Sequence, residues 1–277
     1  MKLLVPYDIT DAVLTSSSVA ENDHAAWSAV TAYALGARCI RNHRIWERLI
    51  PGTTAAAPET DPANWLDVGA TNRWSMFDDS PSTRTSAASS ITVQLALGAV
   101  NDVILMGVAG STVTITKPGG AQVSQAVPAE TIAGEGATVR FAGLGGAAGT
   151  YTVALTGTGT VRIGTIALGA LTSIGDTAYG VSLGIQDYST AAFDEYGTLE
   201  LIRRGYSRRA KFPLTMPIGS MSQVMTILAA LRAKALFWVG DDAKASTVVY
   251  GWFDEASLAK KGQKAVGSIS IKGLTTA

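Results

Sequence analysis

The sequence predicts a mainly β protein with three structural regions and one α-helix near its C-terminal end. Residues 85–186 contain short runs rich in Val, Ile and Thr, separated by Gly-rich turns, which is the pattern of a sandwich or barrel. Residues 220–234 are the stretch in which apolar side chains recur at helical spacing. With 277 residues and 47% hydrophobic side chains, the chain can bury a substantial core.

Changes in composition divide the chain into an N-terminal segment and these three regions. Residues 1–21 form the segment, which is available to pair with a later domain. Residues 22–72, rich in Trp and Arg, predict a small β domain, and residues 73–186 predict a β-sandwich. Residues 187–277 predict a C-terminal β domain that carries helix 220–234 and serves oligomerisation.

The elements follow from local patterns. In the sandwich we expect strands at 91–97, 103–108, 112–116, 138–141, 151–156 and 160–166. In the last region we expect one long strand or a hairpin over 197–216, with a bulge at Gly205, and strands at 236–239, 247–253 and 266–271. The helix buries one face, formed by Met221, Val224, Met225, Leu228 and Leu231. Ser220 and Gln223 predict a capping box at its start.

Charge and cysteine content exclude several classes of protein. Lys and Arg total 22, as do Asp and Glu, whereas a dedicated nucleic-acid binder has a basic excess. Cys39 is the single cysteine, so a disulfide framework and a cysteine-rich metal site are excluded. Apolar stretches end before the roughly 18 residues that a membrane span needs. Charged residues are only 16% of the chain, which favours a surface partly covered by neighbouring subunits.

No motif for catalysis, metal or cofactor binding is present, so we expect a protein that is not an enzyme. The adjacent acidic pairs are interpreted as solvated turn residues: Asp78-Asp79, Asp194-Glu195, Asp241-Asp242 and Asp254-Glu255. Cys39 and His43 are four residues apart, but the arginines around them oppose a cation, so we interpret them as packing or surface residues. The Gly-rich loop 143–149 lacks the Lys-Ser/Thr ending of a phosphate loop.

One basic cluster stands out, and it consists of Arg203, Arg204, Arg208, Arg209 and Lys211. It could contact nucleic acid phosphates, form salt bridges between subunits, or be a charged strand edge that blocks aggregation. Because the segment is strand-like and has no recognition helix, we favour a subunit interface. Acids such as Asp241, Asp242, Asp254 and Glu255 are the expected partners on a neighbouring copy.

Five aromatic residues lie within residues 27–74: Trp27, Tyr33, Trp46, Trp65 and Trp74. Such a cluster can form a platform that stacks on sugar rings, or it can be the core of a small domain. Both interpretations stay open. For the first, the candidate glycan-binding residues are Trp27, Tyr33, Trp46 and Trp65.

Residues 26–67 resemble small chitin-binding-type carbohydrate-binding modules. The matching features are Trp27, Tyr33 and Gly36 in the opening motif, Ile45-Trp46-Glu47 in the second strand, and the closing motif over residues 62–67. Leu66 stands where those modules often have a second aromatic residue. The resemblance implies the module fold and, through it, a contact with host surface glycan.

Most of residues 22–274 resembles minor tail and baseplate proteins, including distal tail proteins, of tailed bacteriophages and prophages. The matching segments are 72–78, 161–169, 187–189, 250–253 and 268–274. The resemblance implies a structural virion protein of the tail tip, present in the host cytoplasm during assembly. Its implied partners are copies of itself, in a ring of six rather than three, and tube and hub proteins. The alternative is a receptor-binding tail component that contacts a host glycan, and a glycan-cleaving depolymerase is the weakest hypothesis.

Overall fold

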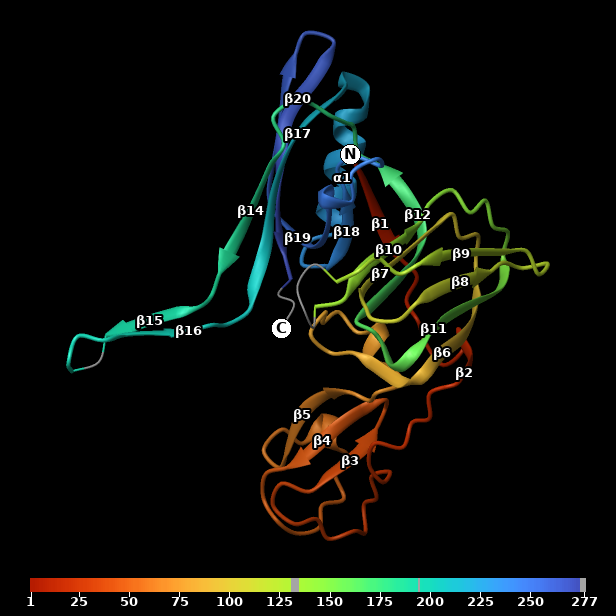
Figure 1. Ribbon diagram of the computed structural model, residues 1–277, viewed down its shortest axis with the longest axis vertical. Coiled ribbons are helices and arrows are strands. Elements are labelled where there is room, and N and C mark those ends of the chain that lie inside the picture. The colour runs from red at the N-terminus through yellow and green to blue at the C-terminus, as the bar shows by residue number, and fades with distance from the viewer. Residues whose placement is uncertain (131–134, 194, 275–277) are drawn as a thin grey trace.

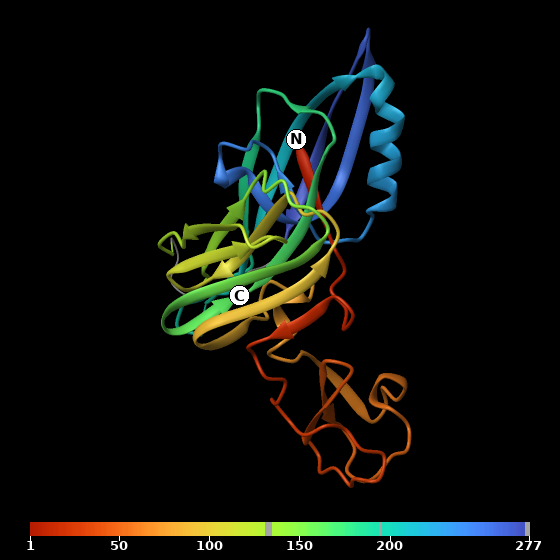
Figure 2. The same cartoon turned by 90° about the vertical axis from the view of Figure 1, so that its right-hand side faces the viewer.

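The computed structural model describes residues 1–130, 135–193 and 195–274, and it is mainly β, with 53% of residues in strands and 8% in helices. Two large sheets form the body of the molecule, and a small sheet lies apart from them, at the bottom of Figure 1. The view in Figure 2 shows the same separation of the small sheet from the body. The predicted fold class is confirmed. Within the described residues, no helix combines the length and apolar character needed to cross a membrane.

The larger sheet has ten strands, and every pair in it is antiparallel. Its order is β10 (Ala137–Phe141), β7 (Asp102–Val108), β12 (Thr165–Ser173), β1 (Lys2–Pro6), β18 (Leu236–Val239), β19 (Val248–Lys261), β20 (Lys264–Gly273), β17 (Tyr206–Pro217) and β13 (Asp176–Thr177), and β14 (Ser182–Asp187) also pairs with β17. The N-terminal strand β1 lies between β12 and β18, so it joins the two predicted regions. The boundary that we placed between residues 186 and 187 falls inside β14.

The second sheet has five strands and packs on part of the first. Its order is β2 (Leu14–Ser17), β6 (Thr85–Leu97), β11 (Gly149–Ile163), β8 (Thr112–Thr116) and β9 (Gln122–Ala126). Ile91, Val93 and Leu95 alternate along β6 and are fully buried. They pack in one core with Leu105 of β7 and Leu168 of β12. This shared core makes the two sheets a sandwich.

The strand that we predicted over residues 160–166 is two strands in two sheets. The chain leaves β11 at Ile163 and enters β12 at Thr165, with Gly164 between them. The Gly164 amide donates to the carbonyl of Met106, and a Cβ atom at residue 164 would lie 2.9 Å from that oxygen. The crossing between sheets therefore requires a residue without a side chain.

The helix α1 (Met221–Ala230) follows a short 3₁₀ turn, η3 (Ile218–Ser220), and it is shorter than the predicted helix 220–234. It ends at Ala230, because Leu231 leaves the helical backbone conformation, and Ala233 beyond it is left-handed, with φ 58°. The capping box is wrong, since Ser220 has helical backbone angles and its side chain makes no capping bond.

The buried face of α1 packs on the C-terminal part of the larger sheet. Val224, Leu228 and Leu231 are buried together with Phe212 of β17 and Trp238 of β18. Met225, which we expected on this face, is exposed. A single helix packed on the sheet was predicted, but its buried stripe is narrower than the sequence suggested.

Residues 197–216 contain parts of two separate pairings. β15 (Thr190–Phe193) and β16 (Leu199–Ile202) form a two-stranded hairpin, and β17 begins only at Tyr206. Gly205 lies in the link between β16 and β17 and is not a bulge within a strand. Together β14, β15, β16 and the start of β17 form an arm that continues from the edge of the larger sheet and extends away from the body of the molecule (Figure 1). We call residues 182–206 the arm.

The small domain consists of a three-stranded sheet and its loops. The strands are β3 (Arg38–Arg41), β4 (Arg44–Arg48) and β5 (Trp65–Ala70), and they pair in that order. Three short 3₁₀ turns complete the elements of the chain: η1 (Pro58–Thr60), η2 (Ser75–Phe77) and η4 (Ala245–Thr247). The core of the small domain contains Cys39, Trp46 and Trp65.

Candidate functional site

The four predicted glycan-binding residues come together in the small domain, but mainly as its core. Trp65 is 2% exposed and Trp46 is 8% exposed. Tyr33 packs its ring edge on Trp65, with the two centroids 5.0 Å apart and the planes at 74°. A ring stacks on a sugar only through an open face, so the burial of Trp46 and Trp65 favours the core interpretation for these two residues.

Trp27 and Tyr33 stay half-buried at the edge of this core. The guanidinium of Arg41 lies 4.6 Å from the centroid of the Trp27 ring, and the Tyr33 hydroxyl accepts a hydrogen bond from the Ser28 amide. Sequence reasoning missed a second cation, Arg48, which is buried in β4 with its guanidinium 5.0 Å from the Trp65 ring. The arginines of this region therefore act in part as stacking groups for tryptophan.

The acidic pairs are dispersed, and several of their carboxylates have partners within the chain. Asp242 forms ion pairs with Lys2 and Arg140, and Asp254 lies 2.7 Å from the Lys272 ammonium. Asp254 and Glu255 lie within β19, not in a turn as we expected. Asp194 lies outside the described residues. Because Asp242 and Asp254 are already paired, they are poor candidates for the partners of a neighbour's basic cluster.

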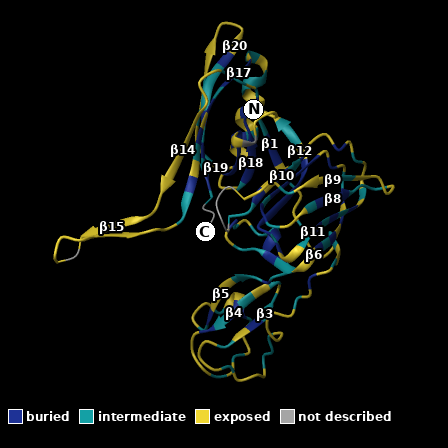
Figure 3. Cartoon of the chain, viewed as in Figure 1, coloured by how far each residue is buried: buried dark blue, intermediate teal, exposed yellow. Residues whose placement is uncertain are grey.

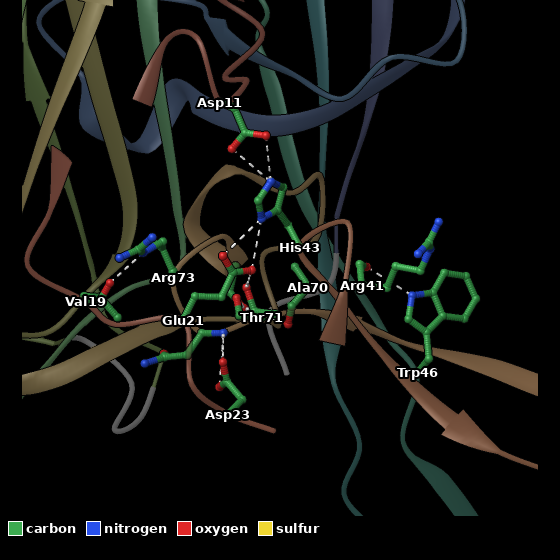
Figure 4. Close-up of polar contacts among 12 residues, drawn as sticks. Asp11, Val19, Glu21, Asp23, Arg41, His43, Trp46, Ala70, Thr71 and Arg73 are labelled. Carbon is green, nitrogen blue, oxygen red and sulfur yellow. Dashed lines mark hydrogen bonds and ion pairs between the residues drawn. The ribbon is translucent and has the colours of Figure 1, made fainter. Parts of the chain in front are cut away.

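His43 forms a junction between the small domain and the N-terminal segment (Figure 4). It occupies the turn between β3 and β4, where Asn42 and His43 have φ angles of 50° and 63°. Two left-handed residues are what a tight hairpin turn of this kind requires. The His43 Nδ1 atom is 3.0 Å from Glu21 Oε1, and its Nε2 atom is 3.0 Å from Asp11 Oδ1.

Residues that follow β5 complete the junction. The Thr71 hydroxyl donates to Glu21, at 2.9 Å, and its amide donates to the carbonyl of His43. The ring of Trp74 stacks on that of His43, with centroids 4.1 Å apart and planes at 27°. Arg73 Nε donates to the carbonyl of Val19 at 2.7 Å. Three chain segments that are distant in sequence are thus held at one histidine.

The electrostatics of the junction favour a charged histidine. Partial burial disfavours the imidazolium, but the hydrogen bonds and negative charges of Asp11 and Glu21 outweigh it and raise the pKa of His43. Sequence reasoning treated His43 only as a neighbour of Cys39, which in fact lies in the domain core. The Asn42-His43 turn is visible in the sequence, but the two carboxylates, far earlier in the chain, are not.

The sequence contains no motif that predicts a metal, catalytic or cofactor-binding residue. In the described ranges, no group of three or more His, Cys, Asp or Glu side chains is arranged to hold a metal ion.

The basic cluster lies along the base of the arm. Arg203 and Arg204 occupy the link between β16 and β17, and Arg208, Arg209 and Lys211 lie in β17. Arg209 donates to the side-chain carbonyl of Gln186 in the adjacent strand β14, at 3.1 Å, while Arg203, Arg204, Arg208 and Lys211 are exposed. The structure therefore gathers the predicted cluster where the arm joins the larger sheet.

The arm also exposes large apolar residues, and its strands carry the colour of exposed residues in Figure 3. Every described residue of β14, β15 and β16 is exposed. Ile185, Phe193 and Leu201 are each between 70% and 73% exposed, and the other large apolar residues exposed on the arm are Leu183, Tyr188, Tyr196, Leu199 and Ile202. Exposed apolar surface of this extent marks a site of interaction.

No family model, curated protein or solved structure matches this chain. What it does has to be inferred from its own surfaces.

Proposed function

We propose that this chain is a structural virion protein of a phage tail tip or baseplate, which forms a ring with copies of itself and displays the small domain at the periphery. In this proposal it assembles in the host cytoplasm, contacts tube and hub proteins, and uses no catalytic residue. The observation that supports it is the arm, which exposes apolar side chains next to the basic cluster and whose hairpin of β15 and β16 pairs with neither large sheet.

The arm is poorly suited to an isolated chain. β15 and β16 pair only with each other, and a lone two-stranded hairpin is at best marginally stable in water. Phe193 and Leu201 would lose most of their exposure if a partner covered the hairpin, and burial of a large apolar side chain contributes about 1.5–3 kcal/mol. A binding partner would therefore stabilise the arm by covering it.

Charge favours a second copy as that partner. Residues 199–211 contain five cationic side chains and one carboxylate, whereas the chain as a whole is neutral. The rest of each copy must carry the compensating excess of acids, which includes exposed residues such as Asp8, Asp176 and Glu255. An arm that binds a different surface on the next copy makes a head-to-tail contact, and such contacts close into rings.

Removal of the arm tests the assembly. Asp187 of β14 pairs with Tyr206 of β17, so residues 188–205 can be replaced by Asn-Gly, which makes a two-residue hairpin at that point. We expect the wild-type chain to sediment as a ring and the shortened chain as a folded monomer. Phe193→Lys should weaken assembly, while Val30→Lys, at an exposed position of the small domain, should leave it intact. A wild-type chain that stays monomeric, or a shortened chain that still assembles, would contradict the proposal.

The virion role needs a separate experiment. Tailed particles from the source strain should contain this chain at the tail tip, and cryo-electron microscopy should place the arm against a neighbouring copy. Particles that lack the chain would remove the virion role even if the isolated protein forms rings.

A receptor-binding role is the second candidate, and it rests on the small domain. Trp27 and Tyr33 keep partly exposed rings on a domain that projects from the body (Figure 2). Trp27→Ala should abolish binding on a glycan array without unfolding the domain, if Trp27 stacks on sugar. Binding that survives this change, or no binding by the wild-type chain, would exclude Trp27 from such a role.

A further inference from the structure

The polar contacts of His43 require two donors from one ring. A neutral imidazole has one N–H donor and one acceptor, whereas the imidazolium has two donors. Both nitrogens of His43 face carboxylates, Glu21 on one side and Asp11 on the other. Only the charged ring can donate to both, and a neutral ring would direct a lone pair at one of the carboxylates.

Asp11 and Glu21 are the charged side chains that face the ring. Neighbouring charges on the same hairpin are engaged elsewhere, because Arg41 pairs with Glu59 and Arg44 pairs with Asp67.

On the segments packed against the hairpin, the other charged groups bind backbone atoms. Arg73 binds the Val19 carbonyl, and Asp23 accepts from the amide of Asn72. The face of the His43 ring is covered by Trp74, and a cation over an indole ring is favourable. The surroundings of the ring are thus selective for its charged form.

We propose that His43 is a proton-operated clamp, which as an imidazolium holds the small domain against Asp11 of the N-terminal segment and on deprotonation releases Asp11. Of the two contacts of the ring, deprotonation breaks only the one with Asp11. Glu21 is also held by the Thr71 hydroxyl, so a neutral ring keeps its Nδ1 proton on Glu21 and loses its contact with Asp11. The Asp11 side chain is 79% exposed and is free to turn to water.

The direction of the pH effect follows from the raised pKa of His43. A group whose pKa is higher in the folded protein contributes stability that is complete below its unfolded pKa, about 6.5, and that is lost as the pH rises through the folded value. The clamp is therefore closed in mildly acidic solution and opens in alkaline solution. This inference does not depend on the proposed role in a phage tail.

Distance measurements between two spin labels test the clamp in the full chain. Labels on cysteines introduced at Val30, in the small domain, and Gly219, beside α1, would report the position of the domain at about pH 5.5 and about pH 8.5. We expect one narrow distance distribution at the lower pH. At the higher pH the ratio of docked to undocked domain should fall about threefold, the effect expected for one partly exposed ion pair.

Three variants identify the group responsible. His43→Asn keeps a residue that tolerates the left-handed turn but has no charge. At both pH values it should therefore give the distance distribution that the wild type gives at the higher pH. His24→Asn changes the other histidine and should behave as the wild type. Asp11→Asn should also abolish the pH dependence, and since Asp11 is exposed, this variant decides the question if His43→Asn fails to fold. Near-ultraviolet circular dichroism of the tryptophans reports whether the domain is folded.

Two results would overturn the clamp. One is a distance distribution in the wild type that stays the same while NMR shows His43 losing its proton. The other is a pH dependence that persists in folded His43→Asn or Asp11→Asn.

Discussion

The Tyr206 hydroxyl donates a 2.8 Å hydrogen bond to Oε2 of Glu135. Tyr206 begins β17 and Glu135 lies just before β10, and these strands are near opposite ends of the ten-stranded order. The sheet is therefore curled, so that β17 and the residue before β10 come into contact. Phe237 and Tyr250 of the central strands line the same cavity as this pair.

Loss of the hydrogen bond between Tyr206 and Glu135 should destabilise the curled sheet. Tyr206→Phe leaves the Glu135 carboxylate without its donor, so we expect the free energy of unfolding to fall by about 1 kcal/mol. Urea unfolding at neutral pH measures it, with Tyr179→Phe at a fully exposed position as the control. Equal losses in the two variants would show that the bond contributes nothing.

The hydrogen bond between Tyr206 and Glu135 should also make the stability of the protein depend on pH in alkaline solution. Burial, and then the hydrogen bond to Glu135, raise the pKa of Tyr206 above its usual value of 10.0. The stabilisation is therefore complete below about pH 10 and is lost as the pH rises through the folded pKa. The difference in the free energy of unfolding between the wild type and Tyr206→Phe should shrink as the pH rises above about 10. A difference that stays constant over this range would contradict the role of the hydrogen bond.

Trp65 should be essential to the small domain. Its side chain is fully buried against Tyr33 and Arg48, and Trp→Ala in a core costs about 3–5 kcal/mol. We expect Trp65→Ala to unfold the domain at room temperature, measured by near-ultraviolet circular dichroism. Leu66→Ala, next to it but half-exposed, should have little effect. A folded Trp65→Ala domain that has lost glycan binding would instead restore the stacking role.

Cys39 should report the opening of the small domain. Burial raises the pKa of the Cys39 thiol to about 11, so the reactive thiolate is scarce at neutral pH. We expect a thiol reagent to label Cys39 only as fast as the domain opens, whereas a cysteine placed at exposed Val30 reacts at once. Trp65→Ala should make Cys39 as reactive as the control. Rapid labelling in the native wild type would contradict the packing of this core.

Gly136 should not tolerate a side chain. It has φ 77°, and an added Cβ would lie 2.4 Å from the carbonyl carbon of Gly107 in β7. We expect Gly136→Ala to lower the free energy of unfolding by about 2 kcal/mol. Gly219→Ala is the matched control, because its Cβ would meet no atom within 4 Å. Equal unfolding midpoints in urea would show that β7 moves aside at no cost.

Local patterns were reliable where neighbours along the chain decide the structure. The strand at 112–116 was predicted to both ends, because alternating Val and Thr residues are followed by the turn signal Lys117-Pro118. The helix was recognised from its period. Its end was not, because Leu231, where the helical backbone stops, and Ala233, which is left-handed, are not residue types that signal a helix end.

The sequence by itself determined the fold class, several strands such as those over 103–108 and 112–116, and the presence of an aromatic cluster and a basic cluster. The tertiary structure alone decided that Ile163 and Thr165 belong to different sheets, that Trp46 and Trp65 are core residues, and that the basic cluster lies at the base of an arm. It also decided that His43 meets Asp11 and Glu21. The physical reason is common to all of these: periodicity reports which face of an element is apolar, but burial and ion pairing depend on which distant segment covers that face.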